Sequence, residues 1–177
     1  MHALVVFESM FGNTEEIARA AAAGLAASVE VEICEVGKAP ALIGPDVGLL
    51  VVGGPTHAFG LSRPGTRKSA AEQTSGPLIS QGPGLREWLA TLQFTSKPMP
   101  VATFDTRIDK PRLPGSAARA AEKRLRRIGA EIVTPSESFF VDGTTGPLLV
   151  GEKERAVLWG AELGRRMKIA PAAIADV

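Results

Sequence analysis

The stretch ALVVFESMFGNT, residues 3–14, determines how the rest of the chain can be interpreted. An apolar run ends at Phe7, a run of small and polar residues follows, and apolar residues at helical spacing begin with Ile17. This pattern predicts a strand, a short polar joint and a helix that begins near Thr14. A strand that is apolar throughout is typical of a parallel sheet covered on both faces by helices.

The same alternation of strand and helix patterns continues along the chain. The predicted strands cover residues 3–7, 29–36, 47–54 and 99–104, and a fifth begins at 130–134 and resumes at 138–141. Residues 29–36, VEVEICEV, alternate between apolar and polar, which indicates an edge strand. We therefore expect an α/β three-layer sandwich with a five-stranded parallel sheet in the order 2-1-3-4-5, built as a single domain over residues 1–177.

Composition excludes several classes of function. Twenty Lys and Arg residues against 19 Asp and Glu residues give a net charge of +1, so we expect no nucleic-acid partner. The single cysteine, Cys34, excludes an internal disulfide, and two histidines alone do not make a metal site. No apolar run approaches the length of a membrane span, and no Gly-Lys-Ser/Thr sequence forms a Walker loop. We expect a cytoplasmic protein.

Two long segments follow predicted strands. Residues 55–84 are rich in Gly, Pro and Ser, and residues 105–116 follow the fourth strand. Both begin at the carboxyl end of a strand, the edge of an open α/β sheet where ligands bind. These segments are therefore predicted to border a ligand site, together with the joint after the first strand.

The joint itself has two interpretations. In one it is an ordinary turn, in which Asn13 caps the helix and Glu16 completes a capping box. In the other it binds a phosphate group through its free N–H groups, the helix dipole and the hydroxyls of Ser9 and Thr14, while Gly12 permits close approach of the backbone. Spacing alone leaves both open.

A family resemblance favours the phosphate site. SMFGNTEE resembles the phosphate-binding loop of flavodoxins, with matches at Ser9, Gly12, Thr14 and Glu15. Phe11 departs from that pattern, because flavodoxins usually have a hydroxyl residue there, so one phosphate contact should be missing or made by the backbone. GGPTHAFGLSRP, residues 53–64, is similar to the flavodoxin loop over one flavin face, and TFDTR, residues 103–107, takes the place of the loop over the other.

The resemblance implies a flavodoxin-like fold and FMN as the cofactor. The implied FMN-binding residues are Ser9, Met10, Phe11, Gly12, Asn13 and Thr14 for the phosphate, and Pro55, Thr56, His57, Phe59, Gly60, Thr103, Phe104, Asp105 and Arg107 around the ring. No catalytic residue is implied, because the flavin would carry the chemistry. The chain has no Tyr, and both Trp residues lie in helical patterns, so His57, Phe59 and Phe104 are the side chains available to contact the ring.

Three functions remain open after this comparison. The first is an electron carrier with a redox partner protein. The second is an enzyme that uses FMN, with NAD(P)H and a small quinone-like substrate or with a protoporphyrinogen-type substrate. The third is a flavin-free binding module that keeps only the fold. The basic residues Arg63, Arg67 and Lys68 form either a solvated surface or a contact for a nicotinamide phosphate or an acidic redox partner.

Overall fold

A parallel sheet forms the centre of the computed structural model, which describes residues 1–110 and 114–169. The sheet strands are β1 (His2–Phe7), β2 (Val31–Glu35), β4 (Val47–Pro55), β6 (Met99–Ile108), β7 (Ala130–Ile132) and β8 (Glu137–Val141). The helices are α1 (Asn13–Ala26), α2 (Pro64–Ala71), α3 (Leu85–Thr91), α4 (Ala117–Arg127) and α5 (Glu152–Ile169), with a short 3-10 turn, η1 (Val36–Lys38). A separate two-stranded ladder pairs β3 (Leu42–Ile43) with β5 (Gln93–Phe94).

The strand order confirms the predicted topology. The sheet runs β2-β1-β4-β6-β7, β8 also pairs with β6, and all these pairs are parallel. The predicted fifth strand is divided in two: β7 pairs with Met99–Val101 and β8 pairs with Phe104–Ile108. The sheet therefore has six strands, although its order is the expected 2-1-3-4-5.

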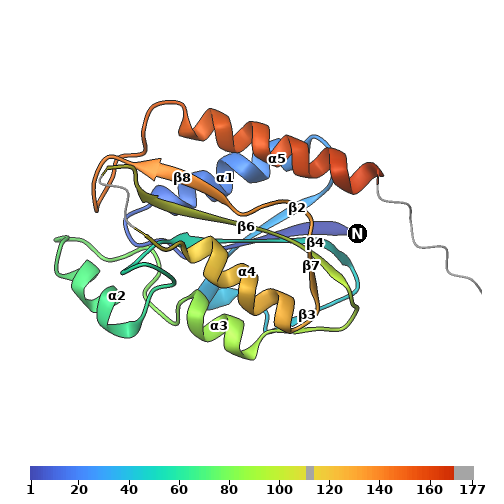
Figure 1. Ribbon diagram of the computed structural model, residues 1–177, viewed down its shortest axis with the longest axis horizontal. Coiled ribbons are helices and arrows are strands. Elements are labelled where there is room, and N and C mark those ends of the chain that lie inside the picture. Colours follow the sequence, from blue (N-terminus) through green and yellow to red (C-terminus); the bar gives the residue numbers. More distant parts are fainter. Residues whose placement is uncertain (111–113, 170–177) are drawn as a thin grey trace, which may run out of the picture.

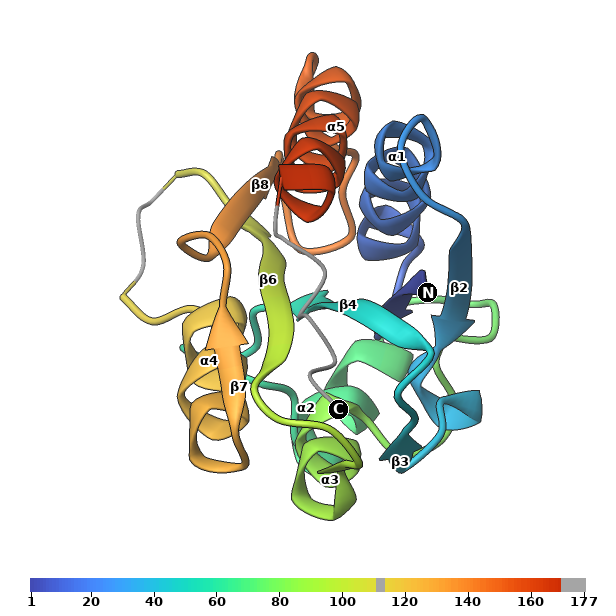
Figure 2. The same ribbon diagram turned by 90° about the vertical axis from the view of Figure 1, so that its right-hand side faces the viewer.

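Helices cover both faces of the sheet, as Figures 1 and 2 show. Helices α1 and α5 lie on one face, and α2, α3 and α4 lie on the other. Alternate residues of the central strands supply the two cores: Val51 packs on the α1 and α5 side, whereas Leu50 and Val52 pack on the opposite side. This alternation confirms the three-layer α/β sandwich.

Two predictions about the irregular segments are wrong. β6 continues to Ile108, four residues beyond the predicted end at Phe104, because β8 pairs with this extension. Residues 55–84 contain helix α2, which begins with Pro64 at a position where the missing N–H costs nothing. Residues 111–113 of the predicted loop 105–116 lie outside the described residues. Within the described residues, no helix has the length and apolar character needed to cross a membrane.

Helices α1 and α5 pack closely against each other through glycine. A Cβ atom added to Gly160 would lie 2.0 Å from the backbone oxygen of Ala21, and one added to Gly24 would lie 2.0 Å from the backbone oxygen of Val157. Backbone atoms cannot move aside as a flexible side chain can. These glycines therefore set how near α5 lies to α1.

We predict that Gly160→Ala lowers the free energy of unfolding by about 1–3 kcal/mol, because the helices must separate. Gly65→Ala in α2 is the matched control: nothing lies within 4 Å of its added Cβ, so stability should stay within about 1 kcal/mol of the wild type. Urea denaturation followed by circular dichroism measures both. Equal stability of the two variants would contradict the glycine-mediated contact.

Candidate functional site

The joint between β1 and α1 is capped by Ser9. Its Oγ accepts hydrogen bonds from the N–H groups of Gly12 at 3.1 Å and Glu15 at 3.3 Å. Gly12 has a φ of 95°, in the left-handed region that favours glycine. The predicted Asn13 cap is wrong: Asn13 is the first helical residue, and its side-chain amide donates to the backbone oxygen of Thr145 at 3.0 Å. The predicted capping box is absent for the same reason.

A second segment fixes the direction of the joint's peptide groups. The N–H groups of Ile79 and Ser80 donate to the backbone oxygens of Met10 and Ser9 at 3.1 and 2.8 Å, and the Ser80 Oγ accepts from the Ser9 N–H at 3.0 Å. We call residues 77–80 the strap. Because the strap takes up these carbonyl groups, the loop cannot turn them toward an anion.

Four N–H groups of the joint remain available to a ligand. Those of Met10, Phe11, Asn13 and Thr14 have no protein acceptor among residues 1–110 and 114–169. The first N–H groups of a helix have no partner within the helix, and the helix dipole makes this end partly positive. The side chain of Glu15 is turned back to Arg19 at 2.7 Å, which offsets its charge near this end. The joint is therefore suited to an oxyanion.

A cavity of about 320 Å³ opens beside the joint. Its size is within the range of roughly 300–1,000 Å³ that small-molecule sites occupy. Of the residues predicted to bind FMN, it is lined by Ser9, Met10, Phe11, Asn13, Thr14, Pro55, Thr56, His57 and Arg107. The structure thus brings together residues from the carboxyl ends of β1, β4 and β6, the strands on which the prediction placed the site.

The sequence did not single out the other residues of the cavity wall, although Ala58 and Thr106 lie within the predicted loops 53–64 and 103–107. These other residues are Ala58, Thr66, Ser69, Ala70, Gln73, Thr106, Ile108, Val141 and Thr144. Thr106 is the most informative, because its Oγ1 lies 2.7 Å from the Oγ1 of Thr14 and is buried with it. The sequence did contain a signal for Thr106, because the polar residues 105–107 directly continue the predicted fourth strand toward the ligand edge of the sheet. The wall formed by helix α2 had no comparable signal, because no helix was expected there.

Several predicted site residues do not line the cavity. Phe104 is fully buried in the core, where its ring packs edge-on against Phe139 and Trp159 at centroid distances of 6.1 and 5.8 Å. Its predicted ring contact is therefore wrong. Phe104 is on the same face of β6 as Thr106 but two residues further into the sheet, beneath helix α5. Thr103 is also buried and outside the cavity.

Asp105 joins loops instead of facing a ligand. Its Oδ2 accepts hydrogen bonds from Thr56 Oγ1 at 3.0 Å, Ser116 Oγ at 2.5 Å and the Ala118 N–H at 3.1 Å. The last two contacts place a carboxylate at the N-terminal end of α4, where it complements the helix dipole. Asp105 therefore holds the Thr56 loop against α4 and shapes the cavity indirectly.

The predicted residues Phe59 and Gly60 form a tight turn at the rim of the site. The N–H of His57 donates to the Gly60 oxygen at 2.8 Å, and the Gly60 N–H donates to the His57 oxygen at 3.0 Å. Ala58 and Phe59 have φ angles of 43° and 73°, a conformation that costs about 1–3 kcal/mol per non-glycine residue. Phe59 is 58% exposed. Neither Phe59 nor Gly60 lines the cavity.

His57 contributes a neutral imidazole to the cavity wall. Burial lowers the pKa of His57, and the positive charge of Arg67 lowers it further. The side chain can therefore donate through one ring nitrogen and accept through the other near pH 7. Arg107 supplies a cation to the same wall, and its Nη1 donates to the backbone oxygen of Gly115 at 2.8 Å.

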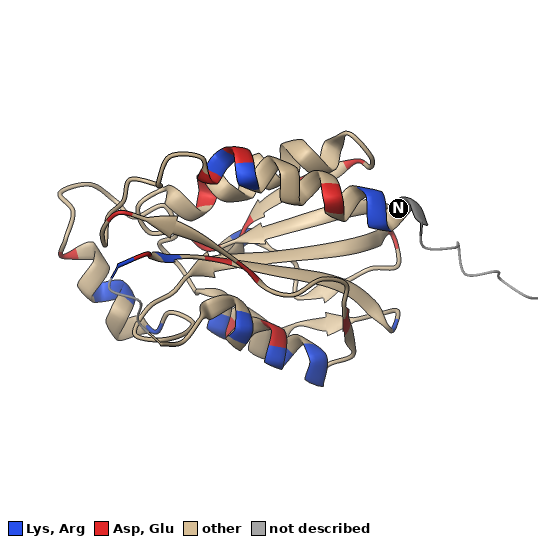
Figure 3. Ribbon diagram, turned by 45° about the horizontal axis from the view of Figure 1, so that its top comes forward, with Lys and Arg blue, Asp and Glu red and all other residues tan. Residues whose placement is uncertain are grey.

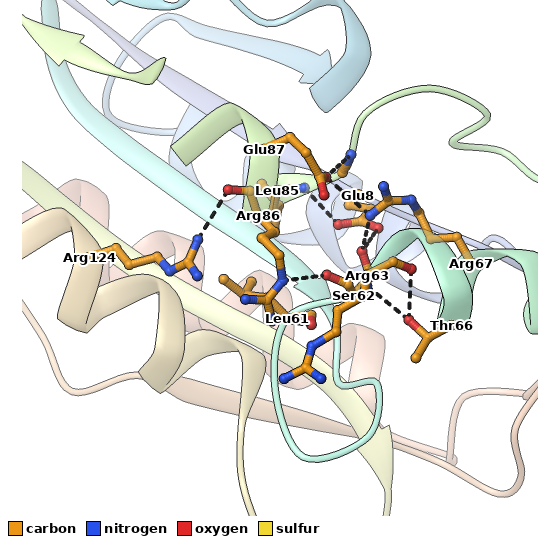
Figure 4. Close-up of polar contacts among 11 residues, drawn as sticks. Glu8, Leu61, Ser62, Arg63, Thr66, Arg67, Leu85, Arg86, Glu87 and Arg124 are labelled. Atoms are coloured by element: carbon orange, nitrogen blue, oxygen red, sulfur yellow. Dashed lines mark hydrogen bonds and ion pairs between the residues drawn. The ribbon is translucent and has the colours of Figure 1, made fainter. Parts of the chain in front are cut away.

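Glu8, immediately before the joint, is the centre of a buried polar network that Figure 4 shows. It is 1% exposed, and its carboxylate accepts from Ser62 Oγ at 2.5 Å and from the Leu85 N–H at 2.8 Å. Arg67 Nη1 donates to the same Ser62 hydroxyl at 2.8 Å and pairs with Glu87 at 3.1 Å. Burial raises the pKa of Glu8, although the bonds from Ser62 and Leu85 oppose the shift. The network ties the end of β1 to α2 and α3.

Comparison with known proteins places this arrangement in a known fold. The chain matches no model of a protein family and no curated protein sequence. Solved structures do match: flavodoxin 1 from Bacillus cereus has a TM-score of 0.66 at 19% identity and covers 93% of this chain and 98% of its own. An archaeal flavodoxin has a TM-score of 0.62 at 16% identity, covering 95% and 99%. This chain has the flavodoxin-like fold.

Other flavodoxin-like proteins match as well. A WrbA-like flavodoxin from Agrobacterium tumefaciens has a TM-score of 0.58 at 16% identity and covers 94% of this chain and 97% of its own. At these identities the likeness concerns the fold. In this flavodoxin-like chain the cavity lies at the carboxyl ends of the central strands, where open α/β sheets bind ligands.

We predict that Glu8 makes the stability of the protein depend on pH. Because the folded state raises the pKa of Glu8 above its ordinary value of 4.5, the folded state binds the proton more tightly than the unfolded chain. The free energy of unfolding should therefore fall as pH rises from 4.5 through the folded pKa, by up to about 1.4 kcal/mol per pH unit. Glu8→Gln should remove this contribution.

The measurement is urea denaturation of the wild type and Glu8→Gln between pH 4 and pH 8, at steps of about one unit. Glu72→Gln is the control, since Glu72 is exposed at the end of α2. The wild type and the control should show the same pH slope, and Glu8→Gln a shallower decline. Parallel curves for all three proteins would show that Glu8 does not hold a raised pKa.

Proposed function

We propose that this protein binds FMN non-covalently and takes part in electron transfer. The observation that carries the proposal is the set of N–H groups of Met10, Phe11, Asn13 and Thr14, which lie at one end of the cavity and have no acceptor in the described part of the chain. A phosphate there would accept these N–H groups and the hydroxyls of Ser9 and Thr14, at the positive end of helix α1. No Lys or Arg is needed for that arrangement.

The donor set fits the phosphate of FMN. Nothing lies within 4 Å of the position a Cβ would take on Gly12, so the backbone is open to close approach there. Ser9 Oγ uses its lone pairs on two N–H groups, which leaves its proton free to donate. Phe11 provides no hydroxyl, so its contribution would come from its N–H.

The rest of the cavity suits a flat, largely apolar ring. Pro55, Thr56 and His57 line it from the end of β4, and Thr106 and Arg107 line it from the end of β6. FMN would supply one- and two-electron redox chemistry at this position. The neutral imidazole of His57 can hydrogen-bond a ring edge, and the cation of Arg107 favours an electron-rich ring nearby. We place this role in the cytoplasm, because a chain with one cysteine forms no internal disulfide and so needs no oxidising compartment.

An enzyme is the second candidate, and one observation favours it. Helix α2 contributes Thr66, Ser69 and Ala70 to the cavity wall, and Gln73 follows just after the helix, in addition to the residues proposed to hold FMN. This wall could hold a substrate beside the ring, such as a quinone reduced at the expense of NAD(P)H or a protoporphyrinogen-type compound. Steady NAD(P)H oxidation with a quinone would support the enzyme, whereas stoichiometric reduction of a purified partner protein would support the carrier. A flavin-free binding module would do neither.

We predict that Thr14→Val weakens FMN binding roughly tenfold to a hundredfold, because a hydrogen bond to a charged group is lost. Riboflavin, which has no phosphate, should bind the wild type and the variant equally. Fluorescence quenching of each flavin on titration with the protein gives the dissociation constants.

Thr106→Val is the matched control, since it breaks the same Thr14 hydroxyl contact at 2.7 Å but keeps the Thr14 hydroxyl. Because Thr106 lines the part of the wall proposed to hold the ring, any effect of this variant should be the same for FMN and for riboflavin. The phosphate assignment fails if Thr14→Val reduces FMN and riboflavin affinity by the same factor.

A further inference from the structure

The near-neutral chain concentrates basic residues on one face of the sheet. Helices α2, α3 and α4, with the residues that cap them, carry nine Lys and Arg residues and three Glu residues. The basic residues are Arg63, Arg67, Lys68, Arg86, Arg119, Lys123, Arg124, Arg126 and Arg127. We call the surface of these three helices the basic face. Since the chain has 20 basic and 19 acidic residues in all, the remaining residues are acidic on balance.

Figure 3 shows the basic residues along α4 and on α2, on one side of the sheet. Two helices that are distant in sequence therefore contribute to one positive surface. The net charge of +1 conceals this surface, because the opposing charges lie elsewhere on the molecule. The positive potential of this surface attracts anionic molecules that approach it, although the whole protein is nearly neutral.

Three arginines form the centre of the basic face, as Figure 4 shows. Arg86 donates from Nε to the Ser62 oxygen at 2.9 Å and from Nη2 to the Leu61 oxygen at 2.8 Å. Arg124 Nη1 donates to the backbone oxygen of Arg86 at 3.1 Å. Backbone carbonyls thus hold these guanidinium groups in place without neutralising them.

The three arginines at this centre form no salt bridge with a carboxylate of the described residues. The salt bridges among the described residues pair Arg67 with Glu87, but they include none of Arg63, Arg86 and Arg124. Burial lowers the pKa of Arg86, and the positive charges of Arg124 and Arg63 lower it further, although the charge of Glu87 opposes the shift. Arg86 is therefore near enough to both other arginines to be repelled by them. A bound anion would relieve the repulsion within this cluster, because it accepts charge-assisted hydrogen bonds from the guanidinium groups.

The arginine cluster lies beside the rim of the cavity. Arg63 is exposed at the N-terminal end of α2, whose Thr66 lines the cavity. The exposed ring of Phe59 belongs to the turn at residues 57–60, shortly before Arg63 in the sequence. The Phe59 backbone packs on Gly115, one residue before the Ser116 cap of α4. Arginine and aromatic residues are the types enriched at protein interfaces.

We propose that the basic face, centred on Arg63, Arg86 and Arg124 with Phe59 at its edge, docks an acidic redox protein. The inference rests on the proposed electron transfer, because a docking surface at the cavity rim would bring a partner's redox centre near the flavin. Guanidinium groups bind carboxylates in a bidentate manner, which gives orientation as well as attraction. Complementary charge increases the rate of association between two proteins. Salt screens this attraction, so the complex stays transient, as electron transfer by a carrier requires.

A protein fits this surface better than single-stranded nucleic acid does. Proteins that bind single strands stack the bases on aromatic side chains. Helices α2 and α4 have no aromatic residue, and the one in α3, Trp88, is buried in the core. Phe59 alone cannot stack successive bases along the face.

The test uses poly-L-glutamate as an acidic polypeptide probe, with and without FMN, at low ionic strength. Arg63→Glu with Arg119→Glu reverses two exposed charges of the basic face and should weaken probe binding at least about tenfold. Lys153→Glu with Arg165→Glu is the matched control, because it makes the same change in net charge at two exposed positions of α5, on the other side of the sheet (Figure 1). Isothermal titration calorimetry gives both affinities, and circular dichroism checks that each variant is folded.

Each outcome decides the inference. Selective loss of binding in the basic-face variant supports it, whereas equal loss in the two variants leaves only net charge and overturns it. Tighter binding of a poly-uridine strand than of poly-L-glutamate at equal charge, or competition by NADPH at a single site, also overturns it. Probe binding does not need flavin, so a protein that fails to bind FMN but still binds poly-L-glutamate at this face refutes the electron-transfer function separately.

Discussion

The fixed direction of the peptide groups between β1 and α1 is the constraint on which the site depends. Ser9 accepts two N–H groups from the start of the helix, and the strap takes up the carbonyl groups of Ser9 and Met10. With those groups satisfied, the remaining N–H donors of the joint have no acceptor in the described residues, and they belong to residues that line the cavity. The left-handed φ of Gly12 makes this turn possible. A preorganised set of donors can bind an anion with little loss of backbone entropy.

The surrounding fold supports this joint from both sides of the sheet. Glu8 connects the end of β1 to Ser62 and to the start of α3, while Asp105 connects β6 to the Thr56 loop and α4. Both carboxyl groups are buried, so their hydrogen bonds exchange with water less readily than surface bonds do. The cavity walls that come from distant parts of the chain are thereby held at fixed positions. The same network places Arg67 and the basic face beside the cavity.

The sequence was most informative where local pattern determines structure. The apolar runs predicted the strands and their order, because buried parallel strands must be apolar on both faces. It was misleading where polar residues are buried through distant partners: Asp105 and Thr106 resemble a loop, but β8, Thr14 and Ser116 keep them in β6. Asn13 has the residue type of a cap, yet Ser9 takes that role from four residues earlier. Phe104 was assigned to the ring from its type, although its place along the strand puts it in the core.

The most direct test of the central claim is the amount of flavin that the purified protein retains. The protein is saturated with FMN, freed of excess by gel filtration, and examined by its visible spectrum, with riboflavin treated in the same way. The account predicts about one FMN per chain and much less riboflavin, because the phosphate supplies the charge that the joint binds. Retention of neither flavin by a chain with native circular dichroism would contradict it.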